Sequence, residues 1–165
     1  MLKEMEKALN KQLNNELYSA YVYFGMSAYF ESIGLRGFAH WMRIQAKEEM
    51  MHVMKYYTYL CGRNSRVVLT TVGAPKADWK SPVEVFEEAY NHEKGVTADI
   101  NKLVDMAIAK SDHATHIFLQ WFVTEQVEEE SSTNTILQEL HLIGKDNGTL
   151  FMLDRELASR TGAEN

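Results

Sequence analysis

The sequence predicts an all-α fold: a four-helix bundle with one long crossover between the second and third helices, plus a short fifth helix. Only two prolines occur in 165 residues, Pro75 and Pro82, so long intervals contain nothing that breaks a helix. Within those intervals apolar residues recur at steps of three and four, which is the helical period. Residues 62–81 form the one long internal segment without that period.

The first two helices are expected at about residues 4–32 and 35–61. Their inward stripes are Leu9, Leu13, Glu16, Ala20, Tyr23 and Ser27 in the first, and Met42, Gln45, Glu49, His52, Tyr56 and Tyr59 in the second. Gly34 and Gly37 frame a short turn between them, and Gly62 is a C-terminal stop signal. A turn this short makes the two helices antiparallel neighbours.

The segment from Val67 to Trp79 is expected to be an extended connection. A strand hairpin is the alternative, but nothing else in the chain offers a sheet to join. A connection of about 17 residues can reach roughly 55 Å, whereas the helices on either side are about 40 Å long. The connection can therefore carry the chain from one end of the bundle to the other, which makes the second and third helices parallel.

The third helix is expected to open at Ser81-Pro82, with serine as N-cap and proline in the first turn. A short turn at residues 110–113, with Ser111 or Asp112 as cap, leads into a fourth helix that ends at about Leu142.

A short fifth helix is expected at about residues 149–159, after the glycines of 144–148. The chain then forms a single domain over residues 1–165, with the bundle at about 4–142. One long crossover between two antiparallel pairs is an established bundle topology.

The composition excludes several classes of protein. The net charge is −6 and no Lys/Arg cluster occurs, which argues against a nucleic-acid surface. No run is long and apolar enough to span a membrane, and the N-terminus lacks a secretory apolar stretch. Cys61 is the only cysteine, so no intrachain disulfide can form and a reducing compartment is expected. These features predict a soluble cytoplasmic protein.

Each long helix carries one acid in the middle of its apolar stripe. These acids are Glu16, Glu49, Glu93 and Glu129. At ~1.5 Å per residue all four lie near mid-height of the bundle, and none of the four stripes contains a lysine or arginine. Four carboxylates cannot all be ionised in a dry interior without cations. Either they are protonated, or metal ions neutralise them.

His52 lies three residues after Glu49, so both side chains share one helix face. Carboxylates with one imidazole suit iron or manganese, and zinc can compete. A single mid-stripe glutamate more often lies at the edge of its face with its carboxylate in water. Four at matched depth, with a histidine beside one of them, favour a metal site.

At these residues the chain resembles the bacterial and archaeal non-haem ferritins, which implies a ferritin-like bundle. The matching pieces are Asn15–Tyr21, Gln45–His52, Tyr90–Glu93, Phe118–Glu130 and Leu153–Leu157. The resemblance covers nearly the whole chain, and its motifs are specific in combination.

The resemblance implies a ferroxidase centre that binds two iron ions. Glu16, Glu49 and His52 would hold the first iron. Glu93 and Glu129 would hold the second, with Glu49 bridging the two ions.

It also implies that Gln126 lies close to this centre. A third iron site beside it would be formed by Glu48, Glu125, Glu128 and Glu129.

Tyr23 and Trp121 match the aromatic residues that flank the centre in the family. Haem is not expected: bacterioferritins carry a second E-x-x-H motif on the fourth helix, whereas here Gln126 is followed three residues later by Glu129. Cys61 alone cannot supply the cysteine-rich iron module of rubrerythrins.

The function implied is iron storage by ferroxidase chemistry. Fe²⁺ would be oxidised by O₂ or H₂O₂, and ferric oxyhydroxide would be deposited inside a closed octahedral shell of identical subunits. The alternative is a di-iron carboxylate oxidase or peroxidase that stores nothing. A third interpretation, a structural bundle whose acids merely face water, predicts no metal binding.

Overall fold

The computed structural model describes residues 1–162, and residues 163–165 of the predicted domain lie outside this range. It contains five helices: α1 (Lys3–Ser32), α2 (Arg36–Gly62), α3 (Pro82–Ala109), α4 (His113–Ile143) and α5 (Asn147–Leu157). The predicted all-α bundle with a short fifth helix is confirmed. None of the helices in the described part is long and apolar enough to cross a membrane.

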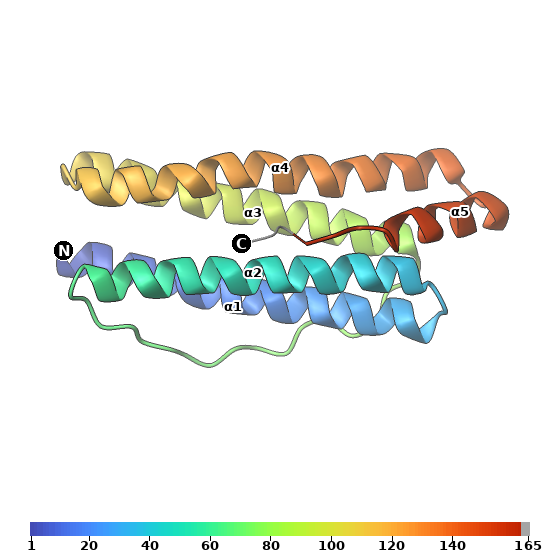
Figure 1. Cartoon of the computed structure of the whole chain (residues 1–165), viewed down its shortest axis with the longest axis horizontal. Helices are drawn as coiled ribbons and strands as arrows, with labels where there is room; N and C mark the ends of the chain where they lie inside the picture. Colours follow the sequence, from blue (N-terminus) through green and yellow to red (C-terminus); the bar gives the residue numbers. More distant parts are fainter. Residues whose placement is uncertain (163–165) are drawn as a thin grey trace.

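The helices lie side by side, and residues 63–81 run along the outside of the bundle from one end to the other (Figure 1). α1 and α2 are antiparallel, α3 runs parallel to α2, and α4 returns antiparallel to α3 (Figure 1). This is the topology that the crossover length predicts. α5 lies at the end where α2 begins and turns the chain back toward the middle of the bundle (Figure 1).

Side chains at the helix starts explain the observed bounds. Ser81 Oγ accepts a hydrogen bond from the backbone N–H of Glu84 at the start of α3. Asp112 caps α4 in the same way, which decides between the two predicted caps, because Ser111 instead adopts a positive φ of 53°. Asp146 caps α5, so this helix begins and ends two residues earlier than predicted.

The crossover is an extended connection without any strand in the described chain, as predicted. Two asparagine side chains of α1 hold it against the bundle. The backbone N–H of Val68 donates to Asn10 Oδ1 at 2.6 Å, and that of Thr70 donates to Asn14 Oδ1 at 2.8 Å. These bonds satisfy backbone groups that have no partner in a helix or sheet.

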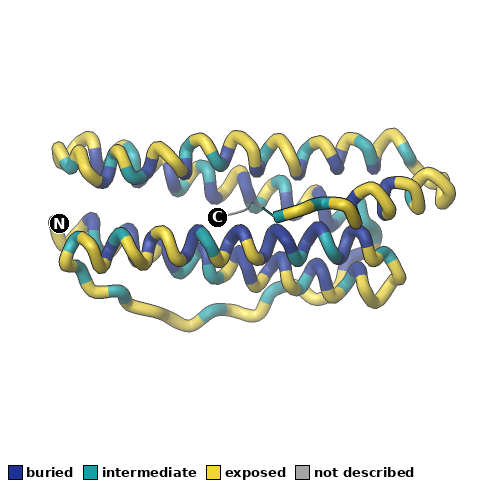
Figure 2. Tube along the Cα trace, viewed as in Figure 1, coloured by how far each residue is buried: buried dark blue, intermediate teal, exposed yellow. Residues whose placement is uncertain are grey.

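The buried side chains lie on the facing sides of the four long helices (Figure 2) and form two apolar clusters. One cluster, around Phe30, Phe38 and Phe86, lies toward the end that carries α5. The other, around Leu9 and Tyr56, lies toward the N-terminal end. Four buried glutamates, described below, lie in the layer between them: Glu16, Glu49, Glu93 and Glu129. Apolar packing on both sides therefore holds this layer in place.

α5 is attached to the first turn of α2 by one buried carboxylate. Asp154 Oδ1 accepts from the backbone N–H groups of Gly37 at 2.8 Å and Phe38 at 3.0 Å. These N–H groups have no partner within α2, and a carboxylate also suits the positive end of the helix dipole. A Cβ at position 37 would lie 1.5 Å from the carbonyl oxygen of Asp154, so only glycine permits this approach.

The contact between α5 and α2 gives a stability prediction. Gly37→Ala forces the Asp154 backbone away and breaks both hydrogen bonds, so we expect a destabilisation of roughly 1–3 kcal/mol. Thermal unfolding of the metal-free protein measures it.

Gly95→Ala in α3 is the matched control, because a Cβ there meets nothing within 4 Å. It should raise stability by roughly 0.5–1 kcal/mol through the helix propensity of alanine. Equal effects of the two substitutions would show that the close approach of α5 is unimportant.

Candidate metal centre

Four carboxylates, one from each long helix, meet in the polar layer between the apolar clusters. Glu16, Glu49, Glu93 and Glu129 are 1%, 2%, 1% and 4% exposed. No lysine or arginine is among the buried residues of the described chain. The cost of burying these charges must therefore be met by imidazole, amide donors, protons or a bound cation.

His52 lies between two of these carboxylates. Its Nδ1 is 3.3 Å from Glu49 Oε2 and 3.7 Å from Glu16 Oε2. The three-residue spacing in α2 places Glu49 and His52 on one face, and packing against α1 adds Glu16. The ligand atoms of these three residues all lie within 4.8 Å of one another, so they could hold one metal ion.

Two glutamine amides orient carboxylates of the centre. Gln12 Nε2 donates to Glu16 Oε1 at 2.8 Å from one turn earlier in α1. Gln45 Nε2, in α2, donates to Glu129 Oε2 of α4 at 2.5 Å. Neither amide is among the residues predicted for the site. The four-residue spacing of Gln12 before Glu16 is the available signal for the first, whereas the second contact depends on how α2 packs against α4.

Glu93 is held from two sides. The Tyr23 hydroxyl donates to Glu93 Oε1, and Gln126 Nε2 donates to Glu93 Oε2 at 3.2 Å. Gln126 Nε2 also lies 3.3 Å from the Glu93 carbonyl oxygen and from Thr97 Oγ1. Tyr23 and Gln126, both predicted at the site, therefore each contact the Glu93 carboxylate.

A second group of ligand atoms lies next to the first, and the two groups share His52. His52, Glu125 and Glu129 also bring ligand atoms within 4.8 Å of one another, and Glu125 Oε1 is 4.0 Å from His52 Nε2. Glu128 is exposed and Glu48 is buried, and neither belongs to this group. Of the four residues expected at a third site, the structure brings Glu125 and Glu129 together with His52.

The electrostatics of His52 reflect its two carboxylate neighbours. Burial by itself would lower the pKa of this imidazole. The carboxylates of Glu16 and Glu49, which lie close to the ring, outweigh burial and raise the pKa to about 11. The metal-free centre therefore holds an imidazolium at neutral pH, and a metal ion that binds His52 must displace its proton.

Burial raises the pKa values of Glu49, Glu93 and Glu129, whereas by itself it would lower that of the imidazole. Desolvation, followed by the charge of Glu93, raises the pKa of Glu129 to about 8. Desolvation also raises the pKa of Glu49 well above its usual value, although His52 partly offsets it. The pKa of Glu93 is raised for the same reason and is partly offset by His92. Protons thus replace the missing positive charge when no metal is bound.

Unsatisfied polar atoms in the centre fit a bound cation. Within residues 1–162, the buried side-chain atoms without a hydrogen-bond partner are Glu16 Oε2, Gln45 Oε1, His52 Nε2 and Tyr56 Oη. An acceptor oxygen and an imidazole nitrogen left unpaired in a dry interior are costly. Because both are metal-ligand atoms within a carboxylate set, iron or manganese fits this donor chemistry, and zinc can compete.

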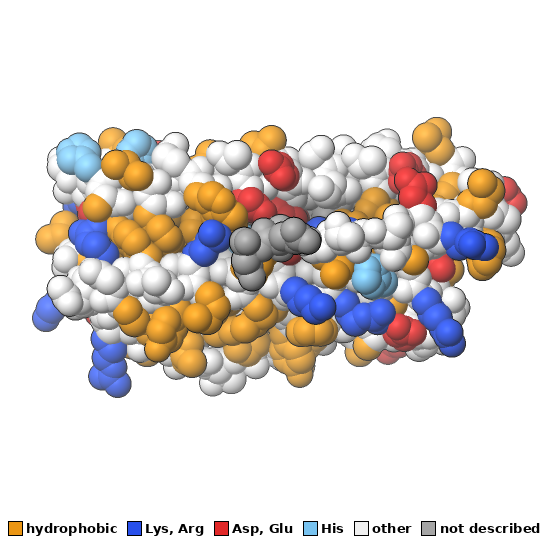
Figure 3. Space-filling view, viewed as in Figure 1, with side chains coloured by type: hydrophobic (Ala, Val, Ile, Leu, Met, Phe, Trp, Pro, Cys, Tyr) orange, Lys and Arg blue, Asp and Glu red, His pale blue; other side chains and the backbone are white. Residues whose placement is uncertain are grey.

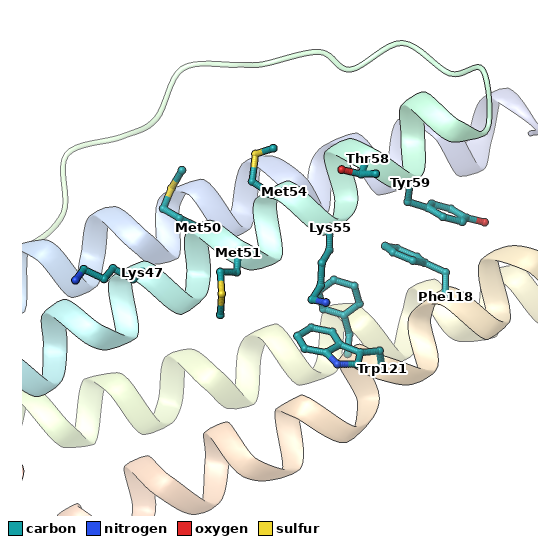
Figure 4. Close-up of a pocket in the computed structure, with 10 residues that line it drawn as sticks. Lys47, Met50, Met51, Met54, Lys55, Thr58, Tyr59, Phe118 and Trp121 are labelled. Carbon is teal, nitrogen blue, oxygen red and sulfur yellow. The ribbon is translucent and has the colours of Figure 1, made fainter. Parts of the chain in front are cut away.

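Aromatic side chains cover His52 on the α4 side. The ring centroids of Trp121 and Phe122 lie 5.5 and 5.8 Å from that of His52. Outside them is a groove of about 790 Å³ between α2 and α4, into which Met51 and Lys55 point (Figure 4). The Lys55 ammonium lies 4.1 Å from the Trp121 ring centroid. Trp121 thus separates the imidazole from the groove.

The chain is similar to known proteins over nearly its whole length. Residues 6–143 match the family described as "Ferritin-like domain". A bacterial non-heme ferritin of Staphylococcus saprophyticus is 40% identical over 163 residues, covering 99% of this chain and 98% of that protein.

Two solved structures from Archaeoglobus fulgidus are similar over the whole bundle. An open-pore ferritin is 49% identical with a TM-score of 0.97, covering 98% of this chain and 99% of that one. A form closed by site-directed mutagenesis is 48% identical with a TM-score of 0.97, covering 99% of both chains.

The raised pKa values predict how stability depends on pH without metal. Native Glu129 holds its proton up to about pH 8, whereas an unfolded glutamate releases it near the usual value of 4.5. His52 acts in the same direction at higher pH. The thermal midpoint of the metal-free protein should therefore fall as pH rises from about 5 to 9.

Glu129→Gln should reduce the fall of the thermal midpoint with pH, because the glutamine amide has no titratable proton to lose. Glu128→Gln, an exposed neighbour on the same helix, should leave the fall as it is in the native protein. A native midpoint that rises over this pH range would contradict the assigned protonation.

Proposed function

This chain belongs to the ferritin family, and from this membership and the buried carboxylate–histidine centre we propose that it is a ferroxidase that stores iron. It oxidises Fe²⁺ to Fe³⁺ with O₂ or H₂O₂ inside each bundle and deposits ferric oxyhydroxide within a hollow multi-subunit shell. The observation that carries this function is a set of buried metal-ligand atoms, two of which have no hydrogen-bond partner in the described chain.

Two iron ions occupy the centre in this proposal. The first ion is held by Glu16, Glu49 and His52. Their ligand atoms all lie within 4.8 Å of one another, which supports this assignment. Glu93 and Glu129 hold the second, with Glu49 as the bridge. The pKa of Glu49 and that of Glu129 both respond to the charge of Glu93, which supports one shared site.

A third iron position lies beside the pair, on the side of α4 that carries Glu125 and Glu129. The second group of ligand atoms, which these residues form with His52, supports it. Glu48 and Glu128 complete the position in this proposal. Their charges raise the pKa of Glu125, so their carboxylates lie within electrostatic reach of it.

Fe²⁺ is the substrate, and the protein's residues determine where it binds and what happens to the protons. Metal binding displaces the protons of His52 and Glu129, so affinity increases with pH. The carboxylates stabilise the higher charge of Fe³⁺ more than that of Fe²⁺, which favours loss of an electron. Tyr23, hydrogen-bonded to Glu93, keeps that carboxylate oriented and lies close enough to exchange an electron with the centre.

Storage requires an assembly of identical subunits. Large apolar side chains on α1 and α2, including Tyr21, Phe24, Met54 and Tyr57, are 44–54% exposed. Figure 3 shows hydrophobic side chains gathered along α2 on one face of the molecule. Such a surface fits a second copy of this chain. The similar Archaeoglobus ferritin is open-pored and was closed by mutagenesis, and we propose the closed octahedral form for this chain.

We place the protein in the cytoplasm, where thiols stay reduced. The single cysteine, Cys61, is free and exposed, which fits a reducing compartment.

Replacing ligands of the first iron position tests the ferroxidase assignment. Glu49→Ala and His52→Ala should each slow the fast phase of Fe²⁺ oxidation more than about tenfold, since even the loss of an outer partner of a ligand commonly costs that much. Stopped-flow absorbance after mixing with Fe²⁺ in air measures the rate.

His141→Ala is the matched control, because this α4 histidine has a side chain that is 50% exposed and lies outside both ligand groups. It should oxidise Fe²⁺ at the native rate. An unchanged fast phase in both ligand variants would refute the site.

A further inference from the structure

The segment after α5 returns over the bundle and brings an arginine to the edge of the metal centre. Residues 158–162 run between α2 and α4 toward the middle of the molecule (Figure 1). Its starting point is fixed by the buried contact of Asp154 with the first turn of α2. Figure 3 shows acidic side chains beside the last described residues.

Arg160 is held in place by several contacts. Its Nη2 donates to Glu48 Oε2 at 2.5 Å, and its Nη1 lies 3.4 Å from the Trp41 carbonyl oxygen. The guanidinium lies over the Trp41 ring at 4.2 Å, and His40 Nε2 lies 2.8 Å from the Arg160 carbonyl oxygen. A side chain with this many partners has a defined position rather than an average one.

The pair of Arg160 and Glu48 is shielded from water. Their side chains are 20% and 11% exposed, so solvent screens the attraction less than at an open surface. Arginine stays charged at every pH at which proteins fold. Glu48 therefore has a permanent positive partner, although it belongs to the carboxylates proposed for the third iron position.

Within residues 158–162, no ion pair joins the C-terminal segment to the other carboxylates of that position. The charge of Glu48 contributes to the raised pKa of Glu125 and of Glu129, so Glu48 faces them electrostatically. Its carboxylate is nonetheless absent from the group formed by His52, Glu125 and Glu129. Glu48 thus belongs to the carboxylates proposed for this position, and its carboxylate is bonded to a cation of the protein itself.

We propose that Arg160 is an internal competitor for the third metal position, which a metal ion can complete only by displacing the guanidinium from Glu48. The idea rests on the proposed function, because it concerns a position beside the iron pair. The pair does not use Glu48, so it fills first and tightly. The third ion binds more weakly and dissociates more easily. This suits an ion that moves on to the mineral rather than one that stays bound.

Titration with Zn²⁺ tests the competition without any oxidation. Zn²⁺ is redox-inert and binds the same donor types, so calorimetry of the assembled metal-free protein reports each binding step. Arg160→Gln removes the charge but keeps a side chain long enough to cover Trp41. The third Zn²⁺ should then bind about tenfold more tightly, since a charge-assisted hydrogen bond no longer has to be broken, while the first two bind as in the native protein.

Arg155→Gln is the matched control, because it removes the same charge from an exposed position on α5. It should leave all three steps as in the native protein. In the double variant Glu48→Gln/Arg160→Gln the gain should disappear, because it depends on a Glu48 carboxylate that Arg160 no longer binds. Arg160→Ala, measured in parallel, should show the same gain as Arg160→Gln.

If the third Zn²⁺ binds Arg160→Gln with the same affinity as the native protein, or with a lower one, the competition is overturned. This holds even if two tight sites remain and the ferroxidase proposal stands. A gain that survives in the double variant would overturn it as well, since Glu48 would not be involved. Absence of two tight sites in the native protein would refute the proposed function itself, and the competition with it.

Discussion

The burial of four carboxylates in one layer is the constraint on which the rest of this structure depends. Glu16, Glu49, Glu93 and Glu129 come from four different helices, and no buried lysine or arginine of the described chain accompanies them. Without metal, the layer is neutralised by the imidazolium of His52 and by protons on carboxylates with raised pKa values. Such an arrangement is a poor way to stabilise a bundle and a good way to bind cations, because every proton it holds can be exchanged for positive charge from a metal.

The surrounding fold keeps that layer in one geometry. Apolar clusters lie on both sides of it, so the helices cannot shift to let the carboxylates reach water. Amide donors from Gln12 and Gln45 and the hydroxyl of Tyr23 each hold a carboxylate oxygen. The centre therefore exists before metal arrives, and the ligands need to lose protons rather than to move.

Much of this could be predicted from the sequence, because it follows from helical period and from helix-breaking residues. The four mid-stripe acids, the E-x-x-H spacing of Glu49 and His52, and the crossover set by its length depend only on local pattern. The contacts of α5 and of the segment after it could not be predicted. Arg160 meets Glu48 across 112 positions of chain, and its place depends on the close approach of α5 to Gly37. No periodic signal encodes either contact.

Glu128 also shows what residue spacing alone does not predict. Its three-residue spacing from Glu125 places both on one part of α4, yet Glu125 reaches His52 whereas Glu128 remains exposed. Spacing specifies the face of a helix, but how far that face turns toward its neighbours is decided by packing.

Loading the protein with iron and then sizing the product shows whether each bundle oxidises iron for storage. Fe²⁺ is added in air to the metal-free protein at rising ratios, and the products are separated by size with detection of both protein and iron. Storage predicts that iron far beyond the few ions one bundle can bind stays in solution and travels with a shell-sized particle. If iron uptake stops at those few ions per chain and the excess precipitates, the account is contradicted, and a di-iron oxidase that stores nothing takes its place.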